Sequence, residues 1–341
     1  MEKIRRLGRT YLQVSRSGFG AIPIQRIGFD EADYLLQKAF NHGINFYDTA
    51  RGYTDSEEKI GRALGGVRDR IVIATKSGAT DRKTLQEHLE TSLKNLRTDY
   101  IDIYQFHNPK KVPRAGDTEE WYEFAQAAKA AGKIRFIGIT NHRLDLAETA
   151  VESGLYDTLQ FPLNYLSSEN ELKLVDRCKE NNIGLIAMKG LSGGLITHAA
   201  AAFAFLRQFD NVVPIWGIQR ETELDEFIAW EQNPPVLDQK LEQVIQSDRI
   251  ELAGDFCRGC GYCLPCPAGI PIPMAARMTF LLRRSFYQQY LQEEWRNKME
   301  LIETCIRCGQ CKSRCPYELD TPGLLKKMYS EYQDFYKQHQ A

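Results

Sequence analysis

An acid, a phenol, an amine and an imidazole follow the ends of three successive apolar runs. Asp48 and Tyr53 follow the first run, Lys76 ends the second and His107 ends the third. A tyrosine hydroxyl with its ordinary pKa of about 10 is a poor proton donor at neutral pH unless its phenolate is stabilised. A Lys76 ammonium would stabilise it, Asp48 would hold the lysine, and His107 would orient the reacting oxygen. These residue types predict proton transfer at a carbonyl or alcohol oxygen; the alternative is four unrelated polar residues at strand ends.

A second set of reactive groups is formed by the cysteines, eight of which fall within residues 257–315. They form two runs, Cys257-x2-Cys260-x2-Cys263-x2-Cys266-Pro267 and Cys305-x2-Cys308-x2-Cys311-x3-Cys315-Pro316. Such dense runs predict metal binding, because a disulfide-stapled chain usually spreads its cysteines more widely. The second run has the bacterial ferredoxin spacing, and the first is one residue shorter before its last cysteine.

The ferredoxin spacing predicts two [4Fe–4S] clusters, each bound by three thiolates of one run and the last thiolate of the other. The predicted ligand sets are Cys257, Cys260, Cys263 and Cys315 for one cluster, and Cys305, Cys308, Cys311 and Cys266 for the other. Two structural zinc sites with four thiolates each are the alternative. Cys178 lies in a helical pattern and is expected to be a buried apolar residue.

The elements that must position the first set of groups alternate between strand and helix. The expected strands are 17–21, 45–48, 71–76, 101–107, 134–139, 158–161, 184–188 and 212–218. Eight such units in about 235 residues predict an α/β fold, a (β/α)8 TIM barrel, in which catalytic groups gather at the C-terminal ends of the strands. A hairpin over 3–14, with its turn at 5–10, should cap the other end, and Asp30 should N-cap the first helix.

Two adjacent prolines at 234–235 mark the expected end of the barrel, because they cannot continue a helix. We expect a barrel over 1–235, a connecting segment over 236–254 with a helix at 236–246, and a small, mainly helical iron–sulfur domain over 255–341. Helical patterns at 278–290 and 294–301 separate the two cysteine runs.

The barrel motifs resemble those of the aldo-keto reductases over essentially residues 1–230. The resemblance rests on Asp48-Thr49-Ala50, Tyr53 with Ser56-Glu57, Ala74-Thr75-Lys76 and Phe106-His107. It implies that Tyr53 is the general acid/base, that Lys76 and Asp48 tune it, and that His107 orients the carbonyl. It also implies that Thr140, Asn141 and Gln160 hold the carboxamide of a nicotinamide.

Two departures from the family pattern bear on the barrel cofactor. Met188-Lys189-Gly190 stands where family members commonly place an aromatic residue, and Arg220 is the only basic residue in 217–223, which also contains Glu223. Because a carboxylate repels a 2′-phosphate, NADH or the smaller FMN is easier to accommodate than NADPH. The expected cofactor contacts after the seventh and eighth strands are Met188, Lys189, Gly190, Gly193, Gly217 and Arg220.

Clusters pass single electrons and nicotinamide passes a hydride, so a nicotinamide in the barrel would not couple readily to a cluster. A flavin handles both, which makes FMN a candidate for the barrel. This gives a carbonyl–alcohol oxidoreductase whose clusters relay electrons to an external one-electron carrier. The alternatives are an NAD(P)H-dependent aldo-keto reductase with structural or redox-sensing clusters, and a non-enzymatic redox-sensing regulatory protein.

Composition limits the partners and the compartment. The 341 residues carry 44 Lys and Arg against 45 Asp and Glu, a net charge of −1, which predicts neither a nucleic acid nor a membrane as partner. The first residues lack the apolar segment of a secretory signal, and no apolar run is long enough to span a membrane. We therefore expect a cytoplasmic enzyme with a small-molecule carbonyl or alcohol substrate.

Overall fold

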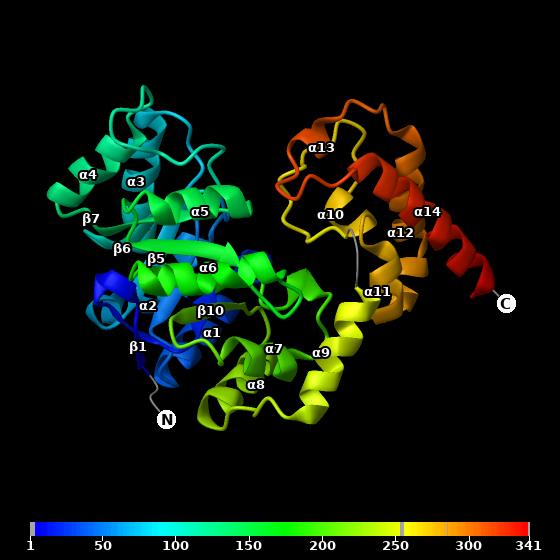
Figure 1. Cartoon of the computed structure of the whole chain (residues 1–341), viewed down its shortest axis with the longest axis horizontal. Coiled ribbons are helices and arrows are strands. Elements are labelled where there is room, and N and C mark those ends of the chain that lie inside the picture. The colour runs from blue at the N-terminus through cyan, green and yellow to red at the C-terminus, as the bar shows by residue number, and fades with distance from the viewer. Residues whose placement is uncertain (1–3, 253–255, 285, 340–341) are drawn as a thin grey trace. The chain divides into compact units, whose positions relative to one another are not determined.

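Figure 1 shows the computed structural model of the chain, which describes residues 4–252, 256–284 and 286–339. The chain divides into two compact units. The first comprises Met1–Gly190 and Ala200–Asp238, and the second comprises Leu191–Ala199 and Gln239–Ala341. A short segment inside the barrel's part of the sequence therefore groups with the cysteine-rich part.

The first unit contains a closed barrel of eight parallel strands, as predicted, in the order β10-β3-β4-β5-β6-β7-β8-β9. The strands are β3 (Gly18–Gly20), β4 (Phe46–Asp48), β5 (Val72–Ser77), β6 (Ile101–His107), β7 (Ile134–Thr140), β8 (Thr158–Pro162), β9 (Gly184–Met188) and β10 (Val212–Gly217). The helices that alternate with them are α1 (Phe29–Asn41), α2 (Ser56–Leu64), α3 (Arg82–Leu96), α4 (Trp121–Ala130), α5 (Leu144–Glu152), α6 (Glu169–Glu180), α7 (Ala199–Leu206) and α8 (Glu221–Gln232). Figure 1 shows this alternation from blue to green.

The barrel strands are short runs buried along their length, because parallel strands are covered on both faces. All six residues of β5 are buried, as are the first six of β6. The hairpin of β1 (Ile4–Arg6) and β2 (Gln13–Ser15) is antiparallel, and its Leu7 packs with Phe46 and Val72, near the starts of their strands. The hairpin thus covers the N-terminal ends of the strands and leaves the C-terminal ends for the site.

Two local predictions were wrong. The hairpin turn lies between Arg6 and Gln13, where the short 3-10 helix η1 (Gly8–Thr10) forms, and not at 5–10. The N-cap of α1 is Gly28, whose extended backbone (φ −67°, ψ 164°) presents its carbonyl to the amide of Ala32 at 3.0 Å. Asp30 instead lies in the first turn, where the helix dipole favours an acid.

The second unit is helical. Its helices are α9 (Gln239–Glu251), α10 (Ile272–Ala275), α11 (Met278–Arg284), α12 (Glu293–Glu300), α13 (Gln310–Ser313) and α14 (Thr321–Gln338). The predicted connecting helix at 236–246 is wrong at both ends, because a turn from Val236 to Asp238 (N···O 2.9 Å) precedes α9. The pattern predicted over 278–290 is split into α11 and the 3-10 helix η5 (Tyr287–Leu291), with residue 285 outside the described residues.

The long C-terminal helix α14, red in Figure 1, supplies much of the core of this unit. Its Leu325, Met328 and Tyr332 are each at most 3% exposed. Thr279 of α11 donates to Glu331 at 2.7 Å, and the Tyr332 hydroxyl donates to the Tyr290 carbonyl at 2.8 Å. No helix in the described ranges is long and apolar enough to cross a membrane.

Candidate active site and metal centres

The acid, phenol, amine and imidazole meet at the C-terminal ends of three neighbouring strands. Asp48 ends β4, Lys76 lies near the end of β5, His107 ends β6, and Tyr53 follows β4 in a loop. Lys76 Nζ lies 2.6 Å from Asp48 Oδ1 and 5.3 Å from the centre of the Tyr53 ring. The Tyr53 and His107 rings meet edge to face, with their centres 6.0 Å apart. The structure therefore brings all four predicted residues into one cluster.

Burial acts on both members of the Asp48–Lys76 pair. Their side chains are 4% and 1% exposed, and Lys76 Nζ also donates to the Thr49 carbonyl at 2.8 Å. Burial raises the pKa of Asp48 and lowers the pKa of Lys76, while the attraction between the two charges opposes both shifts. The two pKa values are thus drawn towards each other, and a proton on Lys76 is easier to release than in water.

His107 is held in its neutral form. Burial, aided by the nearby Lys76 charge, lowers the pKa of His107 to about 3. A neutral imidazole can donate or accept a hydrogen bond, but it does not store a proton at neutral pH. His107 is therefore suited to orienting an oxygen atom beside Tyr53.

A side-chain network inside the barrel fixes the Asp48 carboxylate. Gln105 Nε2 lies 3.3 Å from Asp48 Oδ2 and 3.0 Å from Gln160 Oε1, and Gln160 Nε2 lies 3.3 Å from Asp48 Oδ1. Gln160, expected to hold a carboxamide, thus also positions the acid. Gln105 was not predicted from the sequence, although a signal existed: it is polar within a buried strand and lies two residues before His107, on the same face.

The loop that carries Tyr53 is fixed by the buried carboxylate of Glu57. Glu57 is fully buried and accepts hydrogen bonds from Thr75 and Ser92, each at 2.7 Å. Its other oxygen pairs with Arg51 at 2.9 Å, two residues before Tyr53. Since a buried charge with several partners holds its surroundings in one arrangement, Glu57 is a second positioning residue to which the sequence analysis gave no role.

Thr140 and Asn141, at the end of β7, are both 1% exposed. Thr140 Oγ1 accepts the amide of Asn108 at 3.0 Å, and Asn141 Nδ2 donates to the Pro109 carbonyl at 3.0 Å. Both side chains therefore hold the loop that follows His107.

The residues expected to contact a cofactor after β9 have different surroundings. Met188 is partly buried and packs against the barrel core, whereas Gly190 is buried where a Cβ atom would lie 2.5 Å from the Trp216 ring. Lys189 has a left-handed backbone (φ +61°), and its carbonyl accepts from Asn164 at 3.0 Å. Gly193 lies in the segment that groups with the second unit.

After β10, Gly217 and Arg220 are exposed, and Arg220 is paired with Glu223 at 2.8 Å. Glu223 Oε2 also accepts the amides of Gln219 and Arg220, at 2.9 and 3.1 Å. The N-terminus of α8 is therefore already capped by a carboxylate of its own helix, and a phosphate placed there would meet a negative charge.

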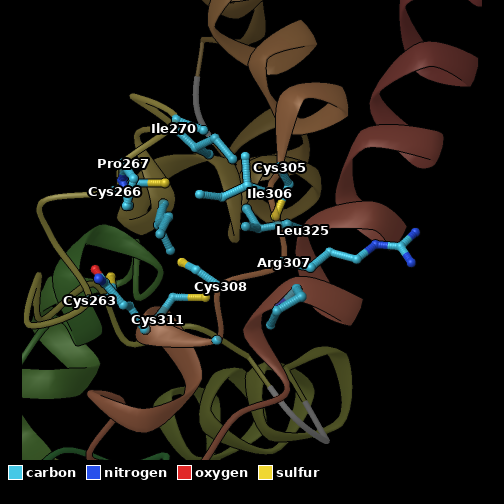
Figure 2. A pocket seen from close by; sticks show the side chains of 15 residues that line it. Cys263, Cys266, Pro267, Ile270, Cys305, Ile306, Arg307, Cys308, Cys311 and Leu325 are labelled. Carbon is cyan, nitrogen blue, oxygen red and sulfur yellow. The ribbon is translucent and has the colours of Figure 1, made fainter.

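The cysteines of the second unit line two cavities. One encloses about 390 Å³ and is lined by Cys263, Cys266, Cys305, Cys308 and Cys311. Figure 2 shows Cys266 and the 305–311 cysteines approaching this cavity from different segments. The other cavity encloses about 360 Å³ and is lined by Cys257, Cys260, Cys263 and Cys315. Each cavity thus receives cysteines from both runs.

The arrangement of the cysteines differs from that of a single-ion site. Among the described residues, no group of three or more His, Cys, Asp or Glu side chains is placed to hold one metal ion. Eight soft thiolate donors around two cavities suit iron–sulfur clusters, whose ligands are spread around a cubane. Cys178, in contrast, is fully buried in α6, and burial raises the pKa of its thiol to about 12.

Both regions of the chain match a known protein family. Residues 17–232 match the model of the aldo/keto reductase family, and residues 256–320 match that of a 4Fe-4S dicluster domain. The chain therefore belongs to the aldo/keto reductase family and carries a 4Fe-4S dicluster domain after its barrel. The zinc alternative for the cysteine runs is set aside by the second match.

Relatives of known name match the barrel. The aldo-keto reductase YhdN of Bacillus subtilis is 34% identical over 208 residues, which are 55% of this chain and 62% of YhdN. The NADH-specific methylglyoxal reductase of Escherichia coli is 30% identical over 231 residues, 58% of this chain and 69% of that protein. An aldo/keto reductase of Klebsiella pneumoniae, solved in complex with NADPH, has a TM-score of 0.63 and 23% identity, covering 73% of this chain and 95% of its own.

Proposed function

We propose that this protein interconverts a carbonyl and an alcohol, with Tyr53 as general acid/base. The observation that carries the proposal is the placement of Lys76 Nζ between the Asp48 carboxylate, at 2.6 Å, and the Tyr53 ring, at 5.3 Å. The Lys76 charge favours the phenolate over the phenol and so makes the hydroxyl a better proton donor. Asp48, held by Gln105 and Gln160, keeps the lysine in place.

The neighbouring residues have separate roles in the proposed reaction. A bound nicotinamide would supply a hydride to the carbonyl carbon. Tyr53 then donates its proton to the carbonyl oxygen, and neutral His107 hydrogen-bonds the same oxygen and sets its direction. In the direction of oxidation Tyr53 takes the proton from the alcohol. Because the Glu57 network fixes the Tyr53 loop, the hydroxyl needs little reorganisation before it reacts.

The charges after β10 favour NADH over NADPH. The 2′-phosphate of NADPH would be repelled by Glu223, whose carboxylate pairs with Arg220 and caps α8. The relative that is specific for NADH agrees with this assignment. The likeness to the NADPH-bound structure, at 23% identity, extends to the fold alone.

The two cysteine cavities are proposed to hold two [4Fe–4S] clusters that relay electrons. Cys257, Cys260, Cys263 and Cys315 would bind one, and Cys266, Cys305, Cys308 and Cys311 the other. The lining of the cavities supports this division for seven of the eight cysteines, and Cys263 lines both cavities. Such clusters accept and release one electron at a time. For this reason FMN is the second candidate for the barrel, since a flavin handles both one and two electrons.

Anaerobic purification tests these proposals. Iron and acid-labile sulfide are measured, the small-molecule cofactor is extracted, and reduction of a set of carbonyls that includes methylglyoxal is followed with NADH, NADPH or reduced methyl viologen. We expect turnover with NADH or with viologen and release of nicotinamide or FMN. Turnover with neither donor, in protein that holds iron and sulfide, would overturn the catalytic proposal.

A matched pair of cysteine variants tests the electron relay. Cys311→Ser should abolish turnover with viologen while sparing turnover with NADH, and Cys178→Ser should change neither, because Cys178 lies in α6 of the barrel. Equal viologen rates for Cys311→Ser and the native protein would show that the clusters do not feed the barrel.

A further inference from the structure

Arg277 is a buried cation beside the first cysteine run. It is 5% exposed, and its guanidinium donates to the carbonyls of Pro273 and Gly193, at 2.7 and 2.6 Å, and to the sulfur of Met274 at 3.5 Å. No ion pair with a carboxylate is found for it among the described residues. A buried charge is costly unless an opposite charge lies near, so the cysteine thiolates near Arg277 bear on its energy.

The thiolates of Cys257 and Cys260 are a source of negative charge near Arg277. The guanidinium lies against Gly259, between these two cysteines, where an added Cβ atom would be 2.9 Å from Cζ and 3.0 Å from both terminal nitrogens. Burial lowers the pKa of Arg277, and the charges of Cys257, Tyr290 and Cys260 oppose that shift. The cation is therefore held against the backbone that joins two predicted ligands.

The guanidinium is also held by the segment Leu191–Ala199, which belongs to the same unit. Gly193 accepts from Arg277 through its carbonyl, and a Cβ atom added at Gly193 would be 2.9 Å from the nearest guanidinium nitrogen. Gly193 and Gly259 both have left-handed backbones, with φ +65° and +63°. Two glycines thus leave just enough space for this side chain and fix its position.

We infer that Arg277 selectively raises the reduction potential of the cluster bound by Cys257, Cys260, Cys263 and Cys315. This rests on the proposed function, in which the cysteines bind two clusters. Uptake of one electron makes a cluster and its thiolates more negative by one charge. A fixed cation in a water-poor surrounding favours that reduced state. Arg277 therefore acts on the cluster through its charge alone, without transferring a proton.

Among the described residues that line the other cavity, no buried charged side chain is found. That cavity is lined by Arg307, which is exposed and therefore screened by water. Arg277 thus affects one of the two midpoint potentials, and the other potential serves as an internal reference.

The chain offers a matched control at Arg284. This arginine also donates to the segment Leu191–Ala199, through the Leu195 carbonyl at 3.0 Å. Unlike Arg277, it is neutralised by Asp248 at 2.7 Å and Glu251 at 2.5 Å. Removing Arg284 disturbs the same segment without removing an uncompensated cation from the cysteine run.

The test is an anaerobic titration with dithionite in which both midpoint potentials are followed by electron paramagnetic resonance. Arg277→Gln should lower one midpoint potential and leave the other unchanged, whereas Arg277→Lys, which keeps the charge, should restore most of the native value. Arg284→Gln should change neither. Unchanged potentials in Arg277→Gln, or equal shifts of both, would overturn the inference.

A second pair of variants serves if Arg277→Gln does not assemble its clusters. Met274→Glu places a carboxylate next to the guanidinium and cancels its charge, and Met274→Gln is the neutral control. The potential should fall in Met274→Glu alone; equal potentials in the two variants contradict the inference. Iron and sulfide are measured in every sample, so that native protein without clusters counts against the proposed function and not against the role of Arg277.

Discussion

Lys76 Nζ lies 2.6 Å from Asp48 Oδ1, and both residues are at most 3% exposed. This ion pair joins β4 to β5 inside the barrel, and it also faces the ring of Tyr53. The same contact therefore contributes to the stability of the barrel and to the proposed chemistry, so the variants below need measurements of both.

Tyr53→Phe should reduce kcat by roughly 10²- to 10⁴-fold, because it removes the proposed proton donor while keeping the ring. KM and the thermal midpoint should change little, since the ring contacts with His107 remain. Steady-state kinetics and circular dichroism check this. Tyr34→Phe is the control, as Tyr34 is exposed on α1; a native kcat for Tyr53→Phe would remove Tyr53 from the mechanism.

Lys76→Met and Asp48→Asn should each destabilise the barrel by about 3–5 kcal/mol, because each leaves a buried charge without its partner. The double variant should be less destabilised than the sum of the two, since no unpaired charge remains. Denaturant unfolding of the two single variants and the double variant measures this coupling. Strict additivity would mean that the two side chains do not interact in solution.

The depressed pKa of His107, about 3 against an ordinary value of 6.5, predicts a pH dependence of stability. Between these values the unfolded chain binds a proton that the folded chain does not, so stability falls as the pH falls below about 6.5. At pH 5.5 the loss relative to pH 7.5 should be about 1.4 kcal/mol. Comparing unfolding of the native protein with His107→Gln at both pH values should show a smaller loss in the variant; equal losses would exclude His107 as the cause.

Glu223→Gln should improve the use of NADPH, because it removes the carboxylate charge while an amide oxygen can still cap α8. We expect the KM for NADPH to fall roughly tenfold, about 1.4 kcal/mol, and the KM for NADH to stay within twofold. Glu226→Gln, three residues further along the same helix, is the control. An equal change of KM for NADPH and NADH would show that Glu223 does not act on the 2′-phosphate.

The barrel could be predicted from the sequence because its strands are continuous apolar runs. The predicted bounds 101–107 and 184–188 agree with β6 and β9, and the predicted catalytic residues lie at or near the strand ends. The N-cap at Gly28 and the turn near Gly8 could not be predicted as well, because a cap preference is worth only about 1 kcal/mol and packing can override it.

Other parts of the site depend on contacts between residues distant in sequence. Gln105, Glu57 and Arg277 act through partners 57, 18 and 84 positions away, and no local pattern gives those pairings. The bounds of α14 were not predicted, although its sequence is amphipathic and a mainly helical domain was expected over 255–341. The hydrophobic periodicity of the sequence predicts helices and strands, whereas the contacts of a buried polar network can be identified only in the folded structure.

The placement of Leu191–Ala199 with the second unit has a consequence for anyone who wishes to dissect or recombine this chain. Truncation after Asp238 would keep these nine residues and discard Arg284, the donor to the Leu195 carbonyl. Grafting the cysteine-rich end onto a foreign barrel would likewise need this loop transplanted with it. The two units are therefore interleaved in the gene, not laid end to end.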